Sequence, residues 1–276
     1  VHGQGLFVRA EAEKAERELE AEVGEQKLEA FVRVVSAPDL ELAFPVLLQA
    51  FGLGPIRPNV ALFNWFDREM TTGDAPAMRS YSSYLRMSLR YGCNVVVLAV
   101  HSARLTLLTR NSEKTRRIDV WWRWNASSKL ALLLAYLMSR SEPWSNARLR
   151  VLTERRPGTT DADTLATLTR ELDEARIAAE VTVVKDANWH TMSVSSAETS
   201  LAFVTFRVNA QGLGDASGTP LPNSLEGLPP MALVLAAGEI DLEAQPDEGV
   251  QAESARELDA LEDTSGTSTK SRLEED

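Results

Sequence analysis

The feature that most constrains the fold is an alternation of apolar, β-type runs with amphipathic helical segments. Asn94 to Val100 is apolar after its first residue, as expected of a strand buried on both faces of a parallel sheet. Further β-type runs follow at Arg117 to Trp124, Ala147 to Leu152, Val181 to Val184, Leu201 to Phe206 and Met231 to Leu235. Helical patterns separate them at Ser128 to Ser139 and Asp161 to Ala178. This order predicts an α/β fold with mainly parallel sheets flanked by helices.

The first part of the chain shows the same alternation with weaker signals. Helices are predicted around Ala12 to Val23, at Leu40 to Phe51 and at Pro76 to Arg90. Strands are predicted at the opening VHGQGLFVR, at Phe31 to Val35 and at Asn59 to Phe63. Gly52 and Gly54 are interpreted as the stop of the second helix, because glycine adopts the left-handed geometry of a C-terminal cap without steric cost.

The order of elements restarts after a charged segment, which predicts two successive α/β subdomains. We expect the first subdomain over residues 1–108, a linker at 109–116 and the second subdomain over 117–244. At 276 residues the chain exceeds the usual domain size of about 100 to 200 residues, which agrees with this division. Val1 is interpreted as the edge of an excised domain.

The net charge of -11 is concentrated in residues 239–276, which hold thirteen acidic and three basic residues. The rest of the chain is close to neutral and offers no basic face for nucleic acid, so we predict no nucleic-acid partner. Residues 245–276 are poor in aromatic residues and are predicted to be a disordered acidic tail. This tail is interpreted as a solvated terminus or, alternatively, as an arm that docks on a basic surface of a regulatory protein.

Catalytic and metal-binding patterns are missing from the sequence. The three histidines, His2, His101 and His190, are isolated, and the single cysteine, Cys93, is interpreted as a buried structural thiol. There is no nucleophile elbow. We therefore predict no enzyme, no metal and no cofactor.

A nucleotide site is the functional alternative that an α/β fold suggests. Gly52 and Gly54 follow a helix and precede a strand, which is the wrong order for a phosphate-binding loop. Gln211 to Asn223 holds three more glycines, but it lies between apolar strands and is equally a flexible loop. No phosphate-loop motif occurs in a strand-to-helix context.

The tryptophans of Ile118 to Trp124 allow two interpretations. In a strand, Ile118, Val120, Trp122 and Trp124 face one side, whereas Asp119, Trp121 and Arg123 face the other. The structural interpretation is that Trp121 and Trp122 pack under helices on opposite faces of the sheet. The alternative is that Trp121 or Trp144 lies at a dimer or membrane-domain contact, where aromatic residues are enriched.

Several motifs together resemble the cytoplasmic C-terminal domain of the cation-chloride cotransporters, in a prokaryotic member. The motif positions are Gly52, Leu53, Gly54, Arg57, Pro58 and Asn59, then Ile118, Asp119, Val120, Trp121 and Trp122, then the Leu-rich helix Leu130 to Met138. Trp144 with the following NARLRVL, and LEGLPPMALVLAAGEIDLEA, extend the resemblance over about residues 3 to 245. One departure is Asn125 to Ser128, where animal members commonly have an acidic, Gly-rich turn.

The resemblance implies a domain built from two halves that resemble universal stress proteins. It implies a cytoplasmic regulatory and dimerisation role at the membrane face of a transporter of the Na-K-Cl type, which moves sodium and potassium with chloride by symport. The expected partners are a second copy and the protein's own transmembrane domain. The longest apolar run, Leu130 to Met138, is too short to cross a bilayer. A nucleotide-sensing module of the universal-stress-protein type remains the alternative.

Overall fold

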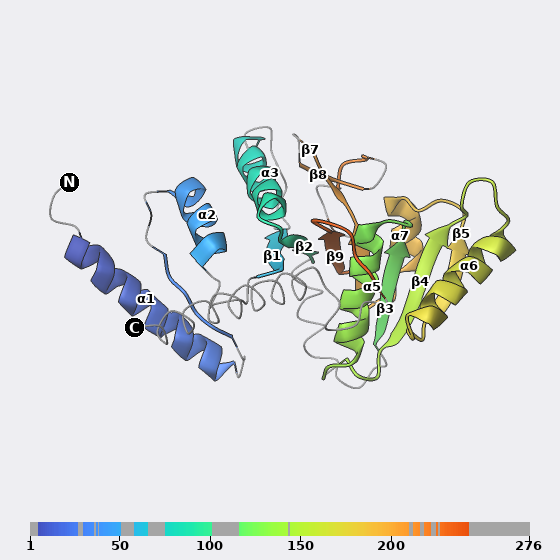
Figure 1. The fold of residues 1–276 in the computed structure, drawn as a ribbon, viewed down its shortest axis with the longest axis horizontal. Helices are drawn as coiled ribbons and strands as arrows, with labels where there is room; N and C mark the ends of the chain where they lie inside the picture. The colour runs from blue at the N-terminus through green and yellow to red at the C-terminus, as the bar shows by residue number, and fades with distance from the viewer. Residues whose placement is uncertain are drawn as a thin grey trace, which may run out of the picture.

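The computed structural model describes residues 5–26, 30–35, 37, 39–50, 58–65, 75–100, 116–142, 144–209, 212–215, 218–221, 225 and 227–242. Seven strands form one sheet in the order β1-β2-β9-β6-β3-β4-β5 (Figure 1). Their bounds are β1 (Val60–Trp65), β2 (Asn94–Ala99), β3 (Arg117–Trp122), β4 (Arg148–Glu154), β5 (Glu180–Val184), β6 (Leu201–Thr205) and β9 (Met231–Leu235). Every neighbouring pair is parallel except β2 with β9. The predicted α/β class with a mainly parallel sheet is confirmed.

Strand β9 joins the two halves of the chain in this sheet. It pairs in parallel with β6 on one side and antiparallel with β2 on the other, where Val97 lies opposite Leu233. The sequence predicts a sheet in each subdomain, whereas the structure continues from one half into the other through this antiparallel pair. The predicted linker lies outside the described residues except for Arg116, so the division into subdomains stays a prediction.

Six helices are described: α1 (Gly5–Glu25), α2 (Leu40–Ala50), α3 (Ala75–Arg90), α5 (Ala126–Ser139), α6 (Asp161–Glu174) and α7 (Trp189–Ser195). Sequence-local caps explain where several of them begin. The Thr160 hydroxyl accepts a hydrogen bond from the Asp163 amide, and Asp163 accepts one in return from the Thr160 amide, which forms a capping box. Asn125 and Asn188 cap α5 and α7 with a single side-chain bond each, which they accept from the backbone amides of Ser128 and Thr191.

Two strand predictions in the first part of the chain are wrong. The opening segment belongs from Gly5 onward to α1, because the Glu- and Ala-rich sequence that follows is a strong helix former. Phe31 to Val35 forms no strand and pairs with no strand of the described sheet, and the Phe31 side chain is 84% exposed.

Three elements of the second half were not predicted. They are the short helix α7 and the antiparallel pair β7 (Arg207–Asn209) and β8 (Gly212–Gly214). The pair includes the start of the segment that the sequence left as a possible flexible loop. Gly212 has a φ of 137°, and a Cβ there would lie 3.2 Å from the Met78 sulfur, so glycine fits both the backbone and the packing.

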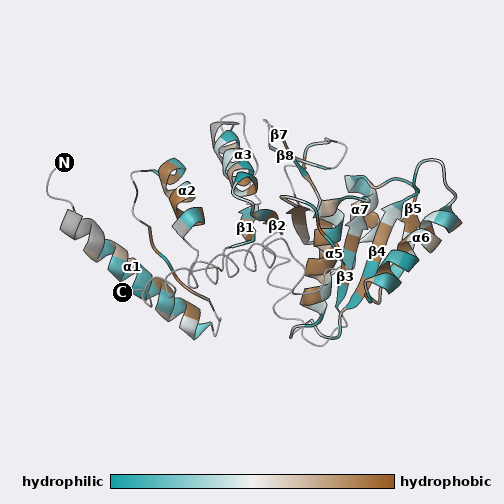
Figure 2. Ribbon diagram, viewed as in Figure 1, coloured by the Kyte–Doolittle hydropathy of each residue, from teal (hydrophilic) through white to brown (hydrophobic). Residues whose placement is uncertain are grey.

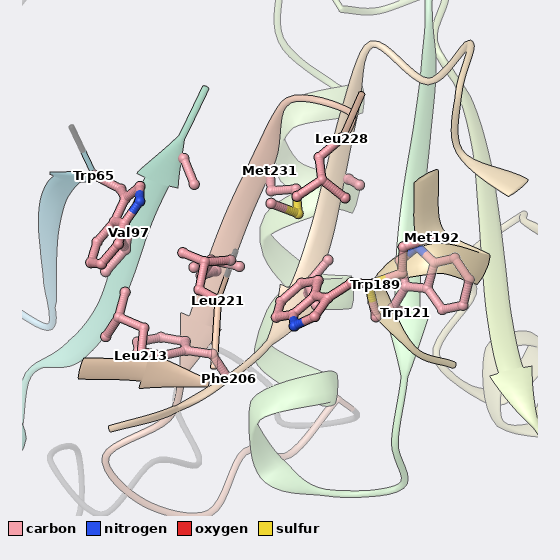
Figure 3. Packing of buried hydrophobic residues seen from close by; sticks show 14 of the residues in the cluster. Trp65, Val97, Trp121, Trp189, Met192, Phe206, Leu213, Leu221, Leu228 and Met231 are labelled. Carbon is pink, nitrogen blue, oxygen red and sulfur yellow. The ribbon is translucent and has the colours of Figure 1, made fainter. Parts of the chain in front are cut away.

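The hydrophobic core lies on both faces of the sheet. The first-face core combines alternate residues of the strands with α3, α7 and the β7–β8 pair; Trp65, Trp121 and Trp189 lie in it (Figure 3). The second-face core holds α5 and α6 against the other side of β3, β4, β6 and β9. Figure 2 shows apolar residues along α5 and mostly polar ones along the described part of α1. Among the described residues, no helix combines the length and the apolar character that crossing a bilayer requires.

Candidate functional site

The motif strand β3 lies between β4 and β6 and is almost completely buried. Ile118, Val120 and Trp122 point into the second-face core, whereas Trp121 points into the first-face core. The predicted alternation and the predicted packing of Trp121 and Trp122 on opposite faces are therefore confirmed. Trp121 is 1% exposed, so in this structure it has almost no surface for a dimer or membrane-domain contact.

Asp119 is the charged centre of β3 and has no exposed surface. Its carboxylate accepts two hydrogen bonds from the Arg150 guanidinium, at 3.0 Å from Nε and 2.7 Å from Nη2. It also accepts hydrogen bonds from the hydroxyls of Ser196, at 2.6 Å, and Thr199. A buried carboxylate is costly unless it is paired and hydrogen-bonded, and here both conditions are met.

The same network links strands β3 and β4 to the end of α7. Arg150 also donates to the carbonyl of Ser195 at 2.7 Å, and Ser196 accepts a hydrogen bond from the Trp121 indole at 3.2 Å. Arg117 lies 3.6 Å from Asp119 and donates to the Thr199 hydroxyl. Asp119 is thus enclosed by side chains of its own fold, and its role in this arrangement is to position β3, β4 and α7 relative to one another.

A second polar cluster lies at the carboxyl end of β3. Arg123 forms an ion pair with Glu154 at 2.7 Å and donates to the carbonyl of Ala187. Glu154 in turn accepts a hydrogen bond from the Ala187 amide. These contacts tie the ends of β3 and β4 to the loop before α7.

Trp124 follows with a φ of 57°, a conformation that is uncommon for a bulky residue. The Arg156 guanidinium lies 4.7 Å from the centre of its ring, and Trp122 meets it edge to face at 5.9 Å. The indole N–H groups of Trp122 and Trp124 are buried and have no hydrogen-bond partner among the described residues. The strained turn is held by packing on both sides.

This end of the sheet is where a doubly wound fold binds ligands. In the order β9-β6-β3-β4-β5, the chain adds β4 and β5 on one side of β3 and then β6 and β9 on the other side, so the order switches between β3 and β6. Ligands of such sheets lie outside the carboxyl ends of the strands at the switch point. Here the helix that follows is capped internally. Asn125 accepts from the Ser128 amide at 2.8 Å, and the Ser127 hydroxyl accepts from the Ala236 amide at 3.0 Å. The Asn125 cap therefore stands where a phosphate would meet the start of α5.

The other motif residues lie apart from β3. Gly52 and Gly54 fall outside the described residues. Pro58 and Asn59 lead into β1: the Pro58 carbonyl accepts from the Cys93 thiol at 3.1 Å, and the Asn59 carbonyl accepts from the Asn94 amide at 2.8 Å. Both contacts align the starts of β1 and β2, which is a structural role.

Trp144 and Cys93 have contrasting environments. Trp144 is half-buried against the second-face core, with the Arg116 guanidinium 4.8 Å from its ring centre. It lies on the face opposite Trp121, so the structure does not bring the two candidate interface residues together. The Cys93 thiol is 2% exposed, and burial raises its pKa, in agreement with the predicted structural thiol. Among the described residues, no group of three or more His, Cys, Asp or Glu side chains is placed to hold a metal ion.

Sequence reasoning missed the partners of Asp119. Arg150 comes 31 residues later and Thr199 comes 80 residues later, and only the parallel register of β3 with β4 and the turn after α7 bring them together. The available signal was a charged residue between apolar residues in each of two predicted strands, Asp119 in one and Arg150 in the other. Each implies a buried partner of opposite charge.

Comparison with known proteins points to one family. Residues 100–213 match the family model described as solute carrier family 12. Mouse solute carrier family 12 member 3 is 27% identical over 149 residues, which cover 47% of this chain and 15% of that protein. The chain thus spans a small part of the length of this relative.

Two solved structures share the fold. The cytoplasmic domain of a prokaryotic cation chloride cotransporter superposes with a TM-score of 0.51 at 17% identity, covering 74% of this chain and 73% of that chain. A universal stress protein from Archaeoglobus fulgidus DSM 4304 superposes with a TM-score of 0.50 at 14% identity, covering 82% and 76%. The resemblance that the motifs indicated is therefore confirmed by sequence and by fold: this chain is similar to solute carrier family 12 in sequence and to the cytoplasmic domain of a prokaryotic cation chloride cotransporter in fold.

Proposed function

We propose that this chain is the cytoplasmic regulatory and dimerisation domain of a cation-chloride cotransporter. The observation that carries the proposal is the family match over residues 100–213, which contains β3, the Asp119 network and the elements packed around them. Ion transport, by symport of sodium or potassium with chloride, belongs to a membrane domain outside these residues. The chain itself then acts at the cytoplasmic face of the membrane, without catalysis, cofactor or nucleic-acid partner.

Mechanistically, such a domain biases transport through contacts that differ between the conformations of the membrane domain. The buried network around Asp119 supports this role, because its hydrogen bonds connect β3, β4 and α7, so that these elements are expected to move together. Two copies would hold two transport units together. The acidic residues 245–276 are proposed to recruit a regulatory protein with a basic surface, and deletion of these residues is expected to abolish that contact.

Dimerisation is tested by measuring the mass of the chain over a range of concentrations by light scattering after gel filtration. We expect a concentration-dependent dimer, and we expect Trp144→Ala to weaken it by at least about fivefold if this half-buried indole lies in the contact. Leu165→Ala on α6, where the side chain is 43% exposed, is the matched control and is expected to leave the mass unchanged. A monomer at all concentrations contradicts the dimerisation role.

The nucleotide-sensing alternative is favoured by one observation, the reversal of strand order between β3 and β6 in a fold similar to a universal stress protein. The Asn125 cap on α5, together with the hydrogen bond that the Ser127 hydroxyl accepts from the Ala236 amide, weighs against it. A thermal-shift titration with ATP and ADP separates the two, because a bound nucleotide raises the melting temperature as its concentration increases. We expect no shift.

A further inference from the structure

Helix α3 carries a basic stripe, formed by Arg79, Arg86 and Arg90. Their spacing of seven and then four residues places the three side chains in one line along a helix. Arg79 and Arg90 are exposed, and Arg86 is partly exposed. The sequence of α3 contains no acidic residue. The helix lies between α2 and the β7–β8 pair (Figure 1).

The charges of the basic stripe are not compensated within the helix. Arg86 and Arg90 are four residues apart, and like charges at this spacing destabilise a helix. Arg90 lies in the last turn, where the helix dipole favours a cation, but Arg79 near the start of α3 has no such role. The stripe therefore costs the isolated helix stability, which an anionic partner would offset.

That partner is not among the described residues for two of the three arginines. Arg79 and Arg90 form no ion pair with any described residue. By contrast, Arg170 on the exposed side of α6 lies 4.0 Å from Glu174, one turn further along its own helix. The pattern on α3 indicates a partner that comes from elsewhere and carries several negative charges.

The acidic residues that follow the sheet have the complementary charge. Residues 247–263 hold seven acidic residues and one basic residue, a net charge of -6. The chain leaves β9 near the end of α3, because the Ala237 amide donates to the Asn94 side chain at 2.9 Å, and Asn94 follows α3 closely.

The length of the chain permits this segment to reach α3. Leu242 packs against the second-face core, so the segment must pass around the sheet. Residues 243–263 span up to about 70 Å when extended, several times the roughly 10 Å diameter of a packed helix. The basic stripe itself is shorter, because Arg79 and Arg90 lie about 16 Å apart along the helix axis.

We propose that the acidic residues 247–263 dock on the basic stripe of α3 in the same chain and are released when a basic partner competes for them. This deepens the proposed function, on which the competing partner rests: a regulatory protein with a basic surface binds only chains whose acidic segment has left α3. Its apparent affinity is then reduced by the fraction of chains in which the segment is docked. The docking itself does not depend on the proposed function.

Two other occupants fit the stripe less well. Residues 66–74, directly before α3, hold three acidic residues and one basic residue, but Arg90 lies at the far end of the helix from them. An anionic membrane would need a broader basic surface. Burial, Glu41 and Asp39 of α2 together raise the pKa of Tyr84 on α3, so negative charge lies beside this helix and repels an extended anionic surface.

The test uses the full 276-residue chain with Arg79→Lys and Arg90→Lys, which keep both charges and supply amines. A carbodiimide joins an amine to a carboxylate in contact with it, and peptide mass spectrometry identifies the joined residues. We expect amides between positions 79 or 90 and residues 247–263, with a yield at least about fivefold lower at about 1 M salt, where the Debye length is about 3 Å. The matched control joins Arg140→Lys with Arg155→Lys, two exposed positions in the second half, and is expected to give no amide to this segment.

Amides confined to residues 66–74 overturn the proposal, because the local segment is then the partner. Amides that join two copies and increase with protein concentration overturn it as well. Sedimentation of the chain with phosphatidylglycerol vesicles, lost on Arg79→Gln with Arg90→Gln, would assign the stripe to a membrane and also overturns it.

A second readout needs no cross-link. A dye on Ser254→Cys reports the mobility of the segment, since Cys93 is buried. We expect Arg79→Glu with Arg90→Glu to lower the fluorescence anisotropy of the dye to its value at about 1 M salt. Arg140→Glu with Arg155→Glu changes the net charge equally and is expected to leave it unchanged; equal anisotropy in the two variants contradicts docking. Neither readout involves transport or a second copy, so failure here leaves the proposed function standing, and the reverse holds.

Discussion

The two halves of the sheet differ in how far they depend on the rest of the molecule. In the second half, β3, β4 and β6 have neighbours on both sides, and the buried Asp119 network fixes them to α7. In the first half, β1 has one neighbour among the described strands, as β5 has in the second half, and α2 exposes about half or more of three apolar side chains, Leu40, Leu42 and Val46. The family match over residues 100–213 covers β3 to β6 and the Asp119 network but not β9. The part of the sequence that matches the family model is thus the part that contains the buried Asp119 network.

The largest expected effect tests whether the Asp119 network holds the second half together. Arg150→Ala leaves the Asp119 carboxylate buried without its bidentate partner, so we expect the free energy of unfolding to fall by about 3–5 kcal/mol. Urea unfolding followed by tryptophan fluorescence measures the change. Arg170→Ala removes an exposed ion pair with Glu174 and is expected to cost no more than about 0.5 kcal/mol. Equal effects for the two variants would mean that the network is not a stabilising centre.

The next effect contrasts the centre of the sheet with its open edge. Leu233→Ala empties a site with no exposed surface where the two halves meet, and we expect a loss of about 2–5 kcal/mol. Leu62→Ala removes a side chain that is 68% exposed, and we expect a change below about 0.5 kcal/mol. The same urea titration reports both. A large loss for Leu62→Ala would show that the edge of β1 is already covered in this chain.

The sequence predicted the second half of the fold far better than the first. Strands such as β3 and β6 are buried on both faces, so their apolar runs are long and unambiguous. The run Phe31 to Val35 has the same local character, but a strand also needs a neighbour, and local sequence does not say whether one is present. Alternation along a strand depends on local sequence, so it placed Trp121 on the correct face. The contacts of Arg150 depend on which strands lie side by side, so they were not predicted.

A smaller effect is expected for the cap of α6, because a cap stabilises the helix locally and does not depend on tertiary packing. Thr160→Ala removes the hydroxyl that caps α6, and we expect a loss of about 1 kcal/mol. Thr160→Ser keeps the hydroxyl and is the matched control. Circular dichroism during thermal unfolding measures both variants, and a Thr160→Ala variant as stable as Thr160→Ser would assign the stability of α6 to its packing alone.

The smallest expected effect is a pH dependence of the same cap. Hydrogen bonds from the Thr160 side chain and backbone lower the pKa of Asp163 below its ordinary value of 3.8. Because the folded-state pKa is depressed, this contribution is present above the unfolded-state pKa and is lost as the pH falls through the folded-state pKa. We expect the acid-side loss of stability below about pH 4 to be shallower in Thr160→Ala than in the unmodified chain. Identical profiles would show that the capping box does not form in solution.

A regulatory role in cation-chloride cotransport is best tested by chloride-dependent cation uptake by the full-length protein in liposomes, with and without residues 5–242. We expect uptake of sodium or potassium that requires chloride on the same side and that changes when this domain is removed, while the membrane domain still inserts. Uptake that is independent of chloride, or that is identical without the domain, would contradict the assignment of a cytoplasmic regulatory role in a cation-chloride cotransporter.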